Sequence, residues 1–203
     1  METLRLYDFL PSGNGYKIRL LLTQISMPFE RIEVNILKGE SRTSEFLSKN
    51  PNGKIPVLEI ADGKYLAESN AILMYLSEGT EFLPYDRFLK AKVLQWLFFE
   101  QYSHEPFIAT SRYWISILGK ADEYKEKLQE KHQRGYEALQ VMENHLTNNN
   151  FLVGKSYTIA DIALFAYTHV ADEGGFDLSK FKAIQDWIGR IKAQQRFIGI
   201  GEG

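Results

Sequence analysis

Short apolar runs separated by polar turns organise the first 78 residues of the chain. Residues 4–10 read as a buried strand, and from Tyr16 onward apolar positions recur on one face of a helix. Residues 30–37 alternate like a second strand, and a short helix is expected over 43–49. The order strand–helix–strand–helix at the front of the chain therefore predicts a βαβ unit.

The stretch from Asn50 to Tyr75 continues this pattern and contains the most turn, strand and helix-cap signals of the chain. Residues 55–60 alternate as a strand, a turn follows at 61–64, and residues 65–67 form a second short strand. A helix comes next, with Ser69 at its expected cap position. Together the two units predict an α/β domain over residues 1–78.

Helical periodicity replaces alternation after the segment 79–84, where we place the domain boundary. The pattern predicts helices over 87–102, 107–118, 122–146 and 181–191, and Pro106 is expected to bend or end the first of them. Thr158 and Asp161 have the spacing of a capping box at the start of a further apolar helix. Residues 85–203 are thus expected to form an all-α domain.

Composition and charge narrow the function classes. The 203 residues carry a net charge of −2 and no long block of one sign, which disfavours nucleic-acid binding and a membrane-binding basic patch. There is no cysteine, so disulfides, thiolate metal sites and a cysteine nucleophile are excluded. The four histidines show no metal-ligand spacing, and neither a signal peptide nor a spanning apolar stretch is found. We expect no metal and a cytoplasmic location.

Three features of the 50–75 stretch suggest a small peptide ligand. If the bond before Pro56 is cis, the main-chain groups of Ile55 turn away from their own sheet and can pair with an extended peptide. A helix start with the Ser69 hydroxyl suits a carboxylate, and Glu68 suits an ammonium group. The alternative is an ordinary hairpin that leads into an ordinary capped helix.

The segments NPNGKIPVL (50–58) and ESNAILMYL (68–76) resemble the glutathione-binding half of the cytosolic glutathione transferases. The resemblance covers essentially the whole chain. It implies a thioredoxin-like N-terminal domain with a cis-proline, Pro56, followed by the all-α domain. It also implies that Ile55 binds the cysteinyl backbone of glutathione and that Glu68 and Ser69 hold its γ-glutamyl head, with Lys54 nearby.

If glutathione is the ligand, the protein must keep its sulfur as a thiolate. The segment PSGNGYK (11–17) offers a hydroxyl, Ser12, between the first strand and the first helix, although Ser and Asn beside Gly are also common turn and cap residues. The segment resembles serine-type, theta- or nu-like bacterial transferases, which implies that Ser12 donates to the thiolate. Bacterial relatives with T/S-x-N-G-x-K here make Asn14 a competing donor, whereas Tyr7 fits the tyrosine-type pattern poorly.

One departure from the family concerns the contact to the glycyl carboxylate. Many relatives have His or Gln after Lys-Gly-Glu, where this chain has Ser41 and Arg42, so Arg42 or Lys38 is the expected substitute. The electrophile pocket is expected between the two domains. Its predicted lining residues are aromatic or apolar: Phe9, Tyr102, Pro106 and Tyr113.

The resulting prediction is a detoxifying, homodimeric transferase that joins the glutathione thiolate to small hydrophobic electrophiles. Two alternatives stay open. One is glutathione-dependent peroxide or disulfide reduction, and the other is a non-catalytic interaction module with the same fold. Glutathione is the expected co-substrate in both enzymatic readings.

Overall fold

The computed structural model describes residues 3–203, which form two compact units. The first runs up to Thr80 and also includes Gln195–Gly203, and the second is Glu81–Gln194. The proposed domains of 1–78 and 85–203 differ from these units in the last nine residues, which pack on the first unit. We call this segment, Gln195–Gly203, the C-terminal tail.

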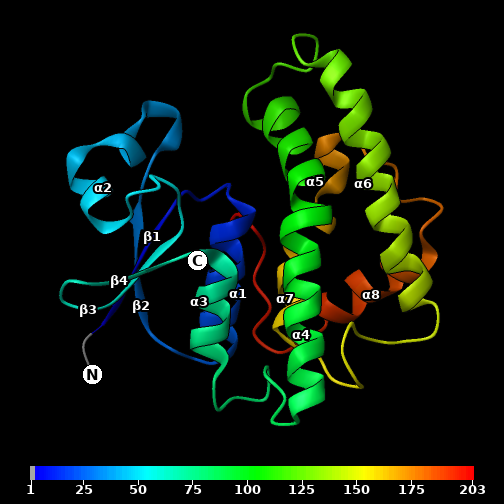
Figure 1. Ribbon diagram of the computed structural model, residues 1–203, viewed down its shortest axis with the longest axis horizontal. Coiled ribbons are helices and arrows are strands. Elements are labelled where there is room, and N and C mark those ends of the chain that lie inside the picture. Colours follow the sequence, from blue (N-terminus) through cyan, green and yellow to red (C-terminus); the bar gives the residue numbers. More distant parts are fainter. Residues whose placement is uncertain (1–2) are drawn as a thin grey trace. The chain divides into compact units, whose positions relative to one another are not determined.

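The first unit contains a mixed sheet flanked by helices (Figure 1). Its elements, in chain order, are β1 (Leu4–Asp8), α1 (Gly13–Gln24), β2 (Phe29–Glu33), the 3-10 turns η1 (Ile36–Lys38) and η2 (Glu40–Arg42), α2 (Ser44–Lys49), β3 (Val57–Ala61), β4 (Lys64–Ala67) and α3 (Ser69–Ser77). The strand order is β2-β1-β3-β4, with β1 and β2 parallel and the other pairs antiparallel. This is the predicted thioredoxin-like arrangement, and the prediction is confirmed.

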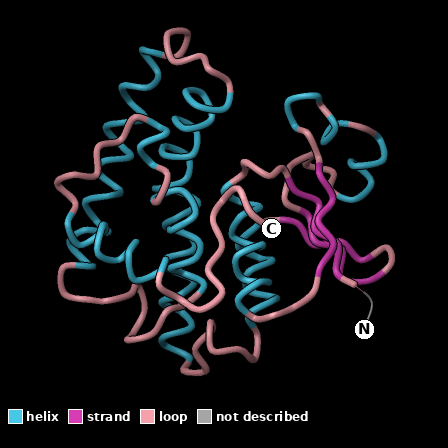
Figure 2. Tube along the Cα trace, turned by 180° about the vertical axis from the view of Figure 1, so that it is seen from behind, coloured by secondary structure: helices cyan, strands magenta, loops and turns pink. Residues whose placement is uncertain are grey.

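Side chains of β1 alternate between buried and more exposed positions, and helices lie on both faces of the sheet (Figure 1). Leu4 and Leu6 are buried, while Arg5 is exposed between them. Helices α1 and α3 lie side by side on one face of the sheet and α2 lies on the other, as Figures 1 and 2 show. On the α2 face, Phe46 packs with Val57 and Val34.

The second unit is helical. Its elements are α4 (Arg87–Phe99), the π-helical turn η3 (Glu100–His104), α5 (Glu105–Arg112), a second π-helical turn η4 (Tyr113–Ile117), α6 (Lys125–Leu146), α7 (Ile159–Thr168), the 3-10 turn η5 (Ala171–Gly174) and α8 (Lys182–Lys192). Every residue of α7 is buried, so this helix is the centre of the unit. The prediction of an all-α region after the α/β domain is confirmed.

Pro106 does not end a helix, contrary to one of the two expectations for it. It lies in the first turn of α5, directly after η3, and helical structure continues from Arg87 to Ile117. A proline is tolerated in a first turn because its missing N–H has no intrahelical partner there.

The predicted capping box at the start of α7 is present. The Thr158 hydroxyl accepts a hydrogen bond from the N–H of Ala160, and the Asp161 carboxylate accepts the N–H of Thr158 at 2.9 Å. Asp161 also accepts the N–H of Leu152 and the indole N–H of Trp187, each at 2.9 Å. Burial raises the pKa of Asp161 to about 6, against the opposing effect of these donors.

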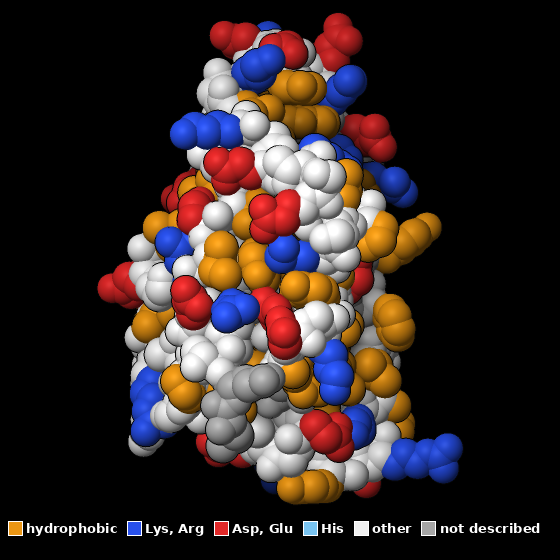
Figure 3. All heavy atoms as spheres, turned by 90° about the vertical axis from the view of Figure 1, so that its left-hand side faces the viewer, with side chains coloured by type: hydrophobic (Ala, Val, Ile, Leu, Met, Phe, Trp, Pro, Cys, Tyr) orange, Lys and Arg blue, Asp and Glu red, His pale blue; other side chains and the backbone are white. Residues whose placement is uncertain are grey.

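Two further observations concern the surface and membrane spanning. On the face drawn in Figure 3, acidic and basic side chains are interspersed, in keeping with the net charge of −2. Within residues 3–203, none of the helices combines the length and the apolar character needed to cross a membrane.

Candidate functional site

The start of α1 holds the first candidate donor, Ser12. The helix begins at Gly13 rather than near Tyr16, so the prediction placed its start three residues too late and Ser12 is the N-cap. The Ser12 Oγ accepts the N–H of Gly15 at 3.3 Å, and the Ser12 N–H donates to the Phe9 carbonyl at 2.7 Å. Since the hydroxyl oxygen is used as an acceptor, its hydrogen is the group that can be offered to an anion.

The first turn of α1 carries no acidic side chain. Its N-terminal N–H groups and the helix dipole therefore favour an external anion near Ser12, which is itself only half-buried. Gly15 lies so close to Asp8 that an added Cβ would come within 1.5 Å of its carboxylate oxygen. A glycine at position 15 is thus required for the loop to pack against β1.

Asn14, Lys17 and Ser69 form a polar cluster that joins α1 to the start of α3. The Asn14 Oδ1 accepts hydrogen bonds from Lys17 Nζ at 2.7 Å and from Ser69 Oγ at 3.0 Å. Lys17 Nζ also donates to Ser69 Oγ at 3.3 Å. Because both donors hold the amide oxygen, the amide nitrogen is the group through which Asn14 can donate to a ligand.

Sequence reasoning assigned no role to Lys17, although its side chain is fully buried. A buried lysine is unusual, and it is found where its ammonium group has partners. The available signal was its position three residues after Asn14 on the same helix, in a run from Tyr16 to Leu22 that is apolar apart from Lys17 and Arg19.

The start of α3 differs from the prediction by one residue. Glu68, not Ser69, occupies the N-cap position, and Ser69 is the first residue of the helix. Glu68 has φ +67° and ψ 112°, a backbone conformation that costs a non-glycine residue on the order of 1–3 kcal/mol. The strained residue presents an exposed carboxylate next to the buried Ser69 hydroxyl.

The predicted peptide-binding edge lies in the segment before β3. The Ile55–Pro56 bond is cis, as the sequence pattern suggested. Asn50 Nδ2 donates to the Lys54 carbonyl at 2.8 Å and fixes the loop that leads to this bond. Within residues 3–203, the main-chain N–H and C=O of Ile55 make no hydrogen bond, so both remain available to a ligand.

Arg42 lies against the same loop. Its guanidinium donates to the Asn52 carbonyl at 3.0 Å, and a Cβ on Gly53 would come within 2.5 Å of it. Gly53 also has φ +63°, which favours glycine there. Arg42 and Lys54 are both exposed, so two cations flank the segment that ends at Ile55.

Tyr7, which we ranked below Ser12 and Asn14, has its hydroxyl engaged elsewhere. The hydroxyl donates to Glu59 at 2.9 Å. Burial, together with the hydrogen bond to Glu59, raises the pKa of Tyr7 to about 12. These contacts agree with its low rank as a thiolate donor.

The residues predicted to line the electrophile pocket fall into both units. In the second unit, Tyr102 and Pro106 line one pocket of about 470 Å³ together with Phe99, Phe107, Arg134 and Val141, whereas Tyr113 is not among its lining residues. In the first unit, Phe9 is buried, with 8% of its surface exposed. The grouping of Phe9 and Tyr113 with the other two stays a prediction.

The described part of the chain offers no cluster for a metal ion. Within residues 3–203, no three His, Asp or Glu side chains are grouped as ligands. The polar side chains of the first unit, in contrast, suit an anionic peptide with a zwitterionic head. They provide two neutral donors at the start of α1, an acid at the start of α3 and cations beside Ile55.

Comparisons with known proteins agree with this geometry. Residues 2–78 match the family described as "Glutathione S-transferase, N-terminal domain", and residues 97–195 match "Glutathione S-transferase, C-terminal domain". The chain is 51% identical to a glutathione S-transferase of Pseudomonas fluorescens Pf-5 whose crystal structure superposes with a TM-score of 0.97, covering 99% of this chain and 100% of that one.

Two further relatives have names or ligands that bear on chemistry. The disulfide-bond oxidoreductase YfcG of Escherichia coli K12 is 34% identical over 194 residues, which is 92% of this chain and 89% of that protein. A glutathione transferase of Pseudomonas putida, crystallised with one glutathione disulfide bound per subunit, is 29% identical with a TM-score of 0.83, covering 96% of this chain and 89% of that one. The chain described here belongs to the glutathione S-transferase family of enzymes.

Proposed function

We propose that this enzyme binds glutathione in its first unit and uses the glutathione thiolate to attack small hydrophobic electrophiles. The observation that carries the proposal is the start of α1. There Ser12 caps the helix with its hydroxyl hydrogen still available, and Asn14 has its amide oxygen held by Lys17 and Ser69. The sulfur–carbon bond forms as the leaving group departs or as an epoxide opens.

The energy needed for thiolate formation is within reach of neutral donors. A free thiol has a pKa of about 8.5, and lowering it by about two requires roughly 2.7 kcal/mol of preference for the anion. A hydrogen bond to a charged group contributes about 1.5–3 kcal/mol. A helix N-terminus adds about 0.3–1 kcal/mol. One hydroxyl or amide at the start of α1 therefore suffices without a general base.

The rest of the tripeptide fits the same unit. Its cysteinyl backbone pairs with Ile55, and its γ-glutamyl head lies at Glu68 and Ser69. Its glycyl carboxylate binds Arg42. Lys54 and Pro56 lie beside the bound tripeptide. Ser69 now donates to Asn14 at 3.0 Å. If the head group takes this hydrogen bond instead, head-group binding and the orientation of Asn14 become coupled.

Disulfide reduction is the second candidate, because the relative YfcG is a disulfide-bond oxidoreductase. The chain has no cysteine, so bound glutathione must supply the sulfur. Its thiolate attacks one sulfur of the substrate disulfide and expels the other as a thiolate. A second glutathione thiolate then attacks the mixed disulfide, which releases oxidised glutathione and the second substrate thiol.

The proposal extends to organisation and setting. Residues 1–78 would be the glutathione-binding domain and residues 85–203 the helical domain, except that the C-terminal tail packs on the first unit. The electrophile pocket would include Phe9, Tyr102, Pro106 and Tyr113. We further propose a cytoplasmic homodimer that acts in detoxification, without nucleic-acid or membrane partners and without a metal.

The first experiment measures retention on immobilised glutathione and the ultraviolet thiolate absorbance of the bound ligand. Wild-type protein should be retained and should show a thiolate signal at neutral pH. Ser48→Ala is the matched control for changing a serine of this unit and should behave like wild type, because Ser48 is exposed and donates to the Glu45 carbonyl inside α2. Absence of retention would contradict the proposal and favour the non-catalytic interaction module.

The second experiment separates the two candidate reactions. Haloarenes, isothiocyanates and epoxides test conjugation, while hydroperoxides and a small disulfide test reduction. Conjugation predicts a thioether product, whereas reduction predicts oxidised glutathione. Turnover of the disulfide alone would replace the first candidate by the second.

A further inference from the structure

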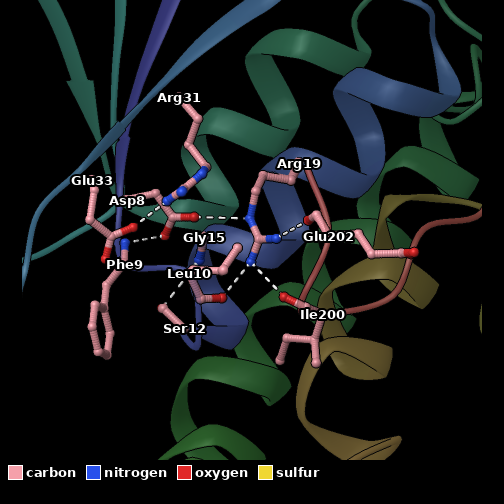
Figure 4. A network of polar contacts seen from close by, with 10 residues as sticks. All are labelled: Asp8, Phe9, Leu10, Ser12, Gly15, Arg19, Arg31, Glu33, Ile200 and Glu202. Carbon is pink, nitrogen blue, oxygen red and sulfur yellow. Dashed lines mark hydrogen bonds and ion pairs between the residues drawn. The ribbon is translucent and has the colours of Figure 1, made fainter.

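Arg19 of α1 is a fully buried arginine with four oxygen acceptors. Its Nε donates to Asp8 Oδ2 at 2.9 Å, and both side chains are completely buried. Its Nη2 donates to the Leu10 carbonyl at 2.7 Å. Figure 4 shows the guanidinium at the centre of this network. The planar fork of arginine can serve such divergent acceptors, whereas the ammonium group of lysine cannot reach them all.

The other two acceptors come from the C-terminal tail. Arg19 donates to the carbonyls of Ile200, at 3.0 Å, and of Glu202. Tyr16, one turn earlier on α1, donates its hydroxyl hydrogen to the Ile198 carbonyl at 2.7 Å. These three hydrogen bonds connect the tail to the first two turns of α1, next to the Ser12 cap.

The same arginine fixes the loop that leads to Ser12. The Leu10 carbonyl bonds to Arg19, and the Phe9 N–H donates to Asp8 Oδ1 at 2.7 Å. The Phe9 carbonyl in turn accepts the N–H of Ser12 at 2.7 Å. Phe9 and Leu10, the two residues that directly follow β1, are thus linked to Arg19, Phe9 through Asp8 and Leu10 directly (Figure 4).

We infer that the C-terminal tail, through Arg19, is a positioning element that holds Ser12 where it meets the glutathione sulfur. This inference rests on the proposed function. The tail contributes two of the four acceptors of Arg19, so its loss leaves the guanidinium free to shift toward water and releases the Leu10 carbonyl. A hydroxyl displaced by about 1 Å loses much of its effect on a reacting atom.

The test is deletion of residues 198–203, followed by pH titration of the thiolate absorbance of bound glutathione. We expect the thiol pKa to rise by about 1 relative to wild type, which corresponds to a tenfold loss of thiolate below that pKa. The maximal rate should fall more than the KM for glutathione rises, because within residues 3–203 Ile55, Glu68 and Arg42 make no hydrogen bond or ion pair with the tail. Tyr16→Phe, which removes one tail contact, should shift the pKa in the same direction by a smaller amount.

Arg196→Ala is the matched control. Arg196 belongs to the same tail, but it donates to the Gln24 carbonyl at the far end of α1, at 3.3 Å. This variant should leave the thiol pKa at its wild-type value. If the deletion does not fold, Arg19→Lys in the full chain carries the test, since it keeps the charge but reaches fewer acceptors, and the same rise is expected.

The outcomes separate the two proposals. A wild-type protein without a thiolate signal contradicts the proposed function and, with it, the role of the tail. If the wild type shows the signal and the folded deletion variant keeps the wild-type thiol pKa, only the role of the tail is overturned. Where the deletion does not fold, an unchanged thiol pKa in Arg19→Lys overturns it in the same way. An equal rise in Arg196→Ala also overturns it, because the effect would then be general loosening of α1.

Discussion

The starts of α1 and α7 have similar N-cap residues but differ in burial and in the presence of an acidic side chain in the first turn. Both helices begin after a hydroxyl residue at the N-cap, Ser12 in one and Thr158 in the other. At α7 the cap is 1% exposed and a buried acid, Asp161, closes the capping box. At α1 the cap is half-buried and no acid lies in the first turn.

The difference shows how one local motif serves either folding or chemistry. An internal carboxylate at a helix start satisfies the N–H groups and stabilises the fold, but it leaves nothing for a ligand. A helix start without an acid keeps its positive end for an external anion. We therefore assign the start of α7 to stability and the start of α1 to thiolate binding. The variants below test this division of roles between the two helix starts.

The largest expected effect is on stability at α7. Asp161→Ala leaves buried N–H groups of Leu152, Thr158 and Trp187 without their acceptor, so we expect a loss of about 3–5 kcal/mol in the free energy of unfolding. Chemical denaturation measures it. Asp177→Ala, at an exposed loop carboxylate, is the control and should have a small effect. A loss at Asp161 no larger than the control would refute the division.

The pH dependence of Asp161 gives the next largest effect. Its folded pKa of about 6 lies above the unfolded value of 3.8, so between these values the folded state binds more protons. The stability contributed by the protonated acid is full below pH 4 and is lost as pH rises through 6. Relative to Asp161→Asn, wild type should thus gain up to about 3 kcal/mol from pH 7 to pH 4. A difference that does not vary with pH would contradict this.

Ser12 and Thr158 should show opposite profiles when each is changed to alanine. Ser12→Ala should cost about 1 kcal/mol in stability and raise the thiol pKa of bound glutathione by about 1–2. Thr158→Ala should cost about 1–2 kcal/mol and leave the thiol pKa unchanged. Chemical denaturation of both variants measures the loss of stability, and titration of the thiolate absorbance measures the thiol pKa. Equal effects on the thiol pKa would mean that the two caps do not differ in function.

Lys17→Met tests whether the polar cluster at α1 orients Asn14. The variant removes one of the two donors to Asn14 Oδ1, so the thiol pKa should rise by somewhat less than about 1. In the double variant with Asn14→Ala, the two effects should not add, because both act through the same amide. Fully additive shifts would show that Lys17 acts on the sulfur independently.

The smallest effect is expected at Tyr7. Tyr7→Phe removes a hydroxyl that already donates to Glu59, so the thiol pKa should remain at the wild-type value. Thiolate titration checks this as well. A rise comparable to that of Ser12→Ala would move the donor from the start of α1 to β1.

The sequence predicted the fold well because its signals are local and repeated. The apolar run that starts β1, the turn at Gly63 and the capping box at Thr158 each depend on a few neighbouring residues, and each was found in the structure. Helix starts were less accurate. Gly13 and Gly15 read as turn residues, yet they lie inside α1, since close packing against Asp8 excludes a side chain at Gly15.

The contacts that the sequence did not predict are those between distant segments. Lys17 reaches Ser69, 52 positions away, and Arg19 reaches the carbonyls of the tail about 180 positions later. A buried cation has no periodic signature, and a tail without helical pattern gives no hint of its partner. The candidate donors Ser12 and Asn14 were found only because the motif around them resembles a known family.

The central claim is that neutral groups at the start of α1 keep the glutathione sulfur ionised. The most direct measurement is the pH titration of thiolate absorbance for glutathione bound to wild type, Ser12→Ala and Asn14→Ala. The account predicts a wild-type thiol pKa near 6.5, about two below that of the free thiol, and a rise in at least one variant. A wild-type pKa equal to that of free glutathione, or the same lowered value in all three proteins, would contradict it.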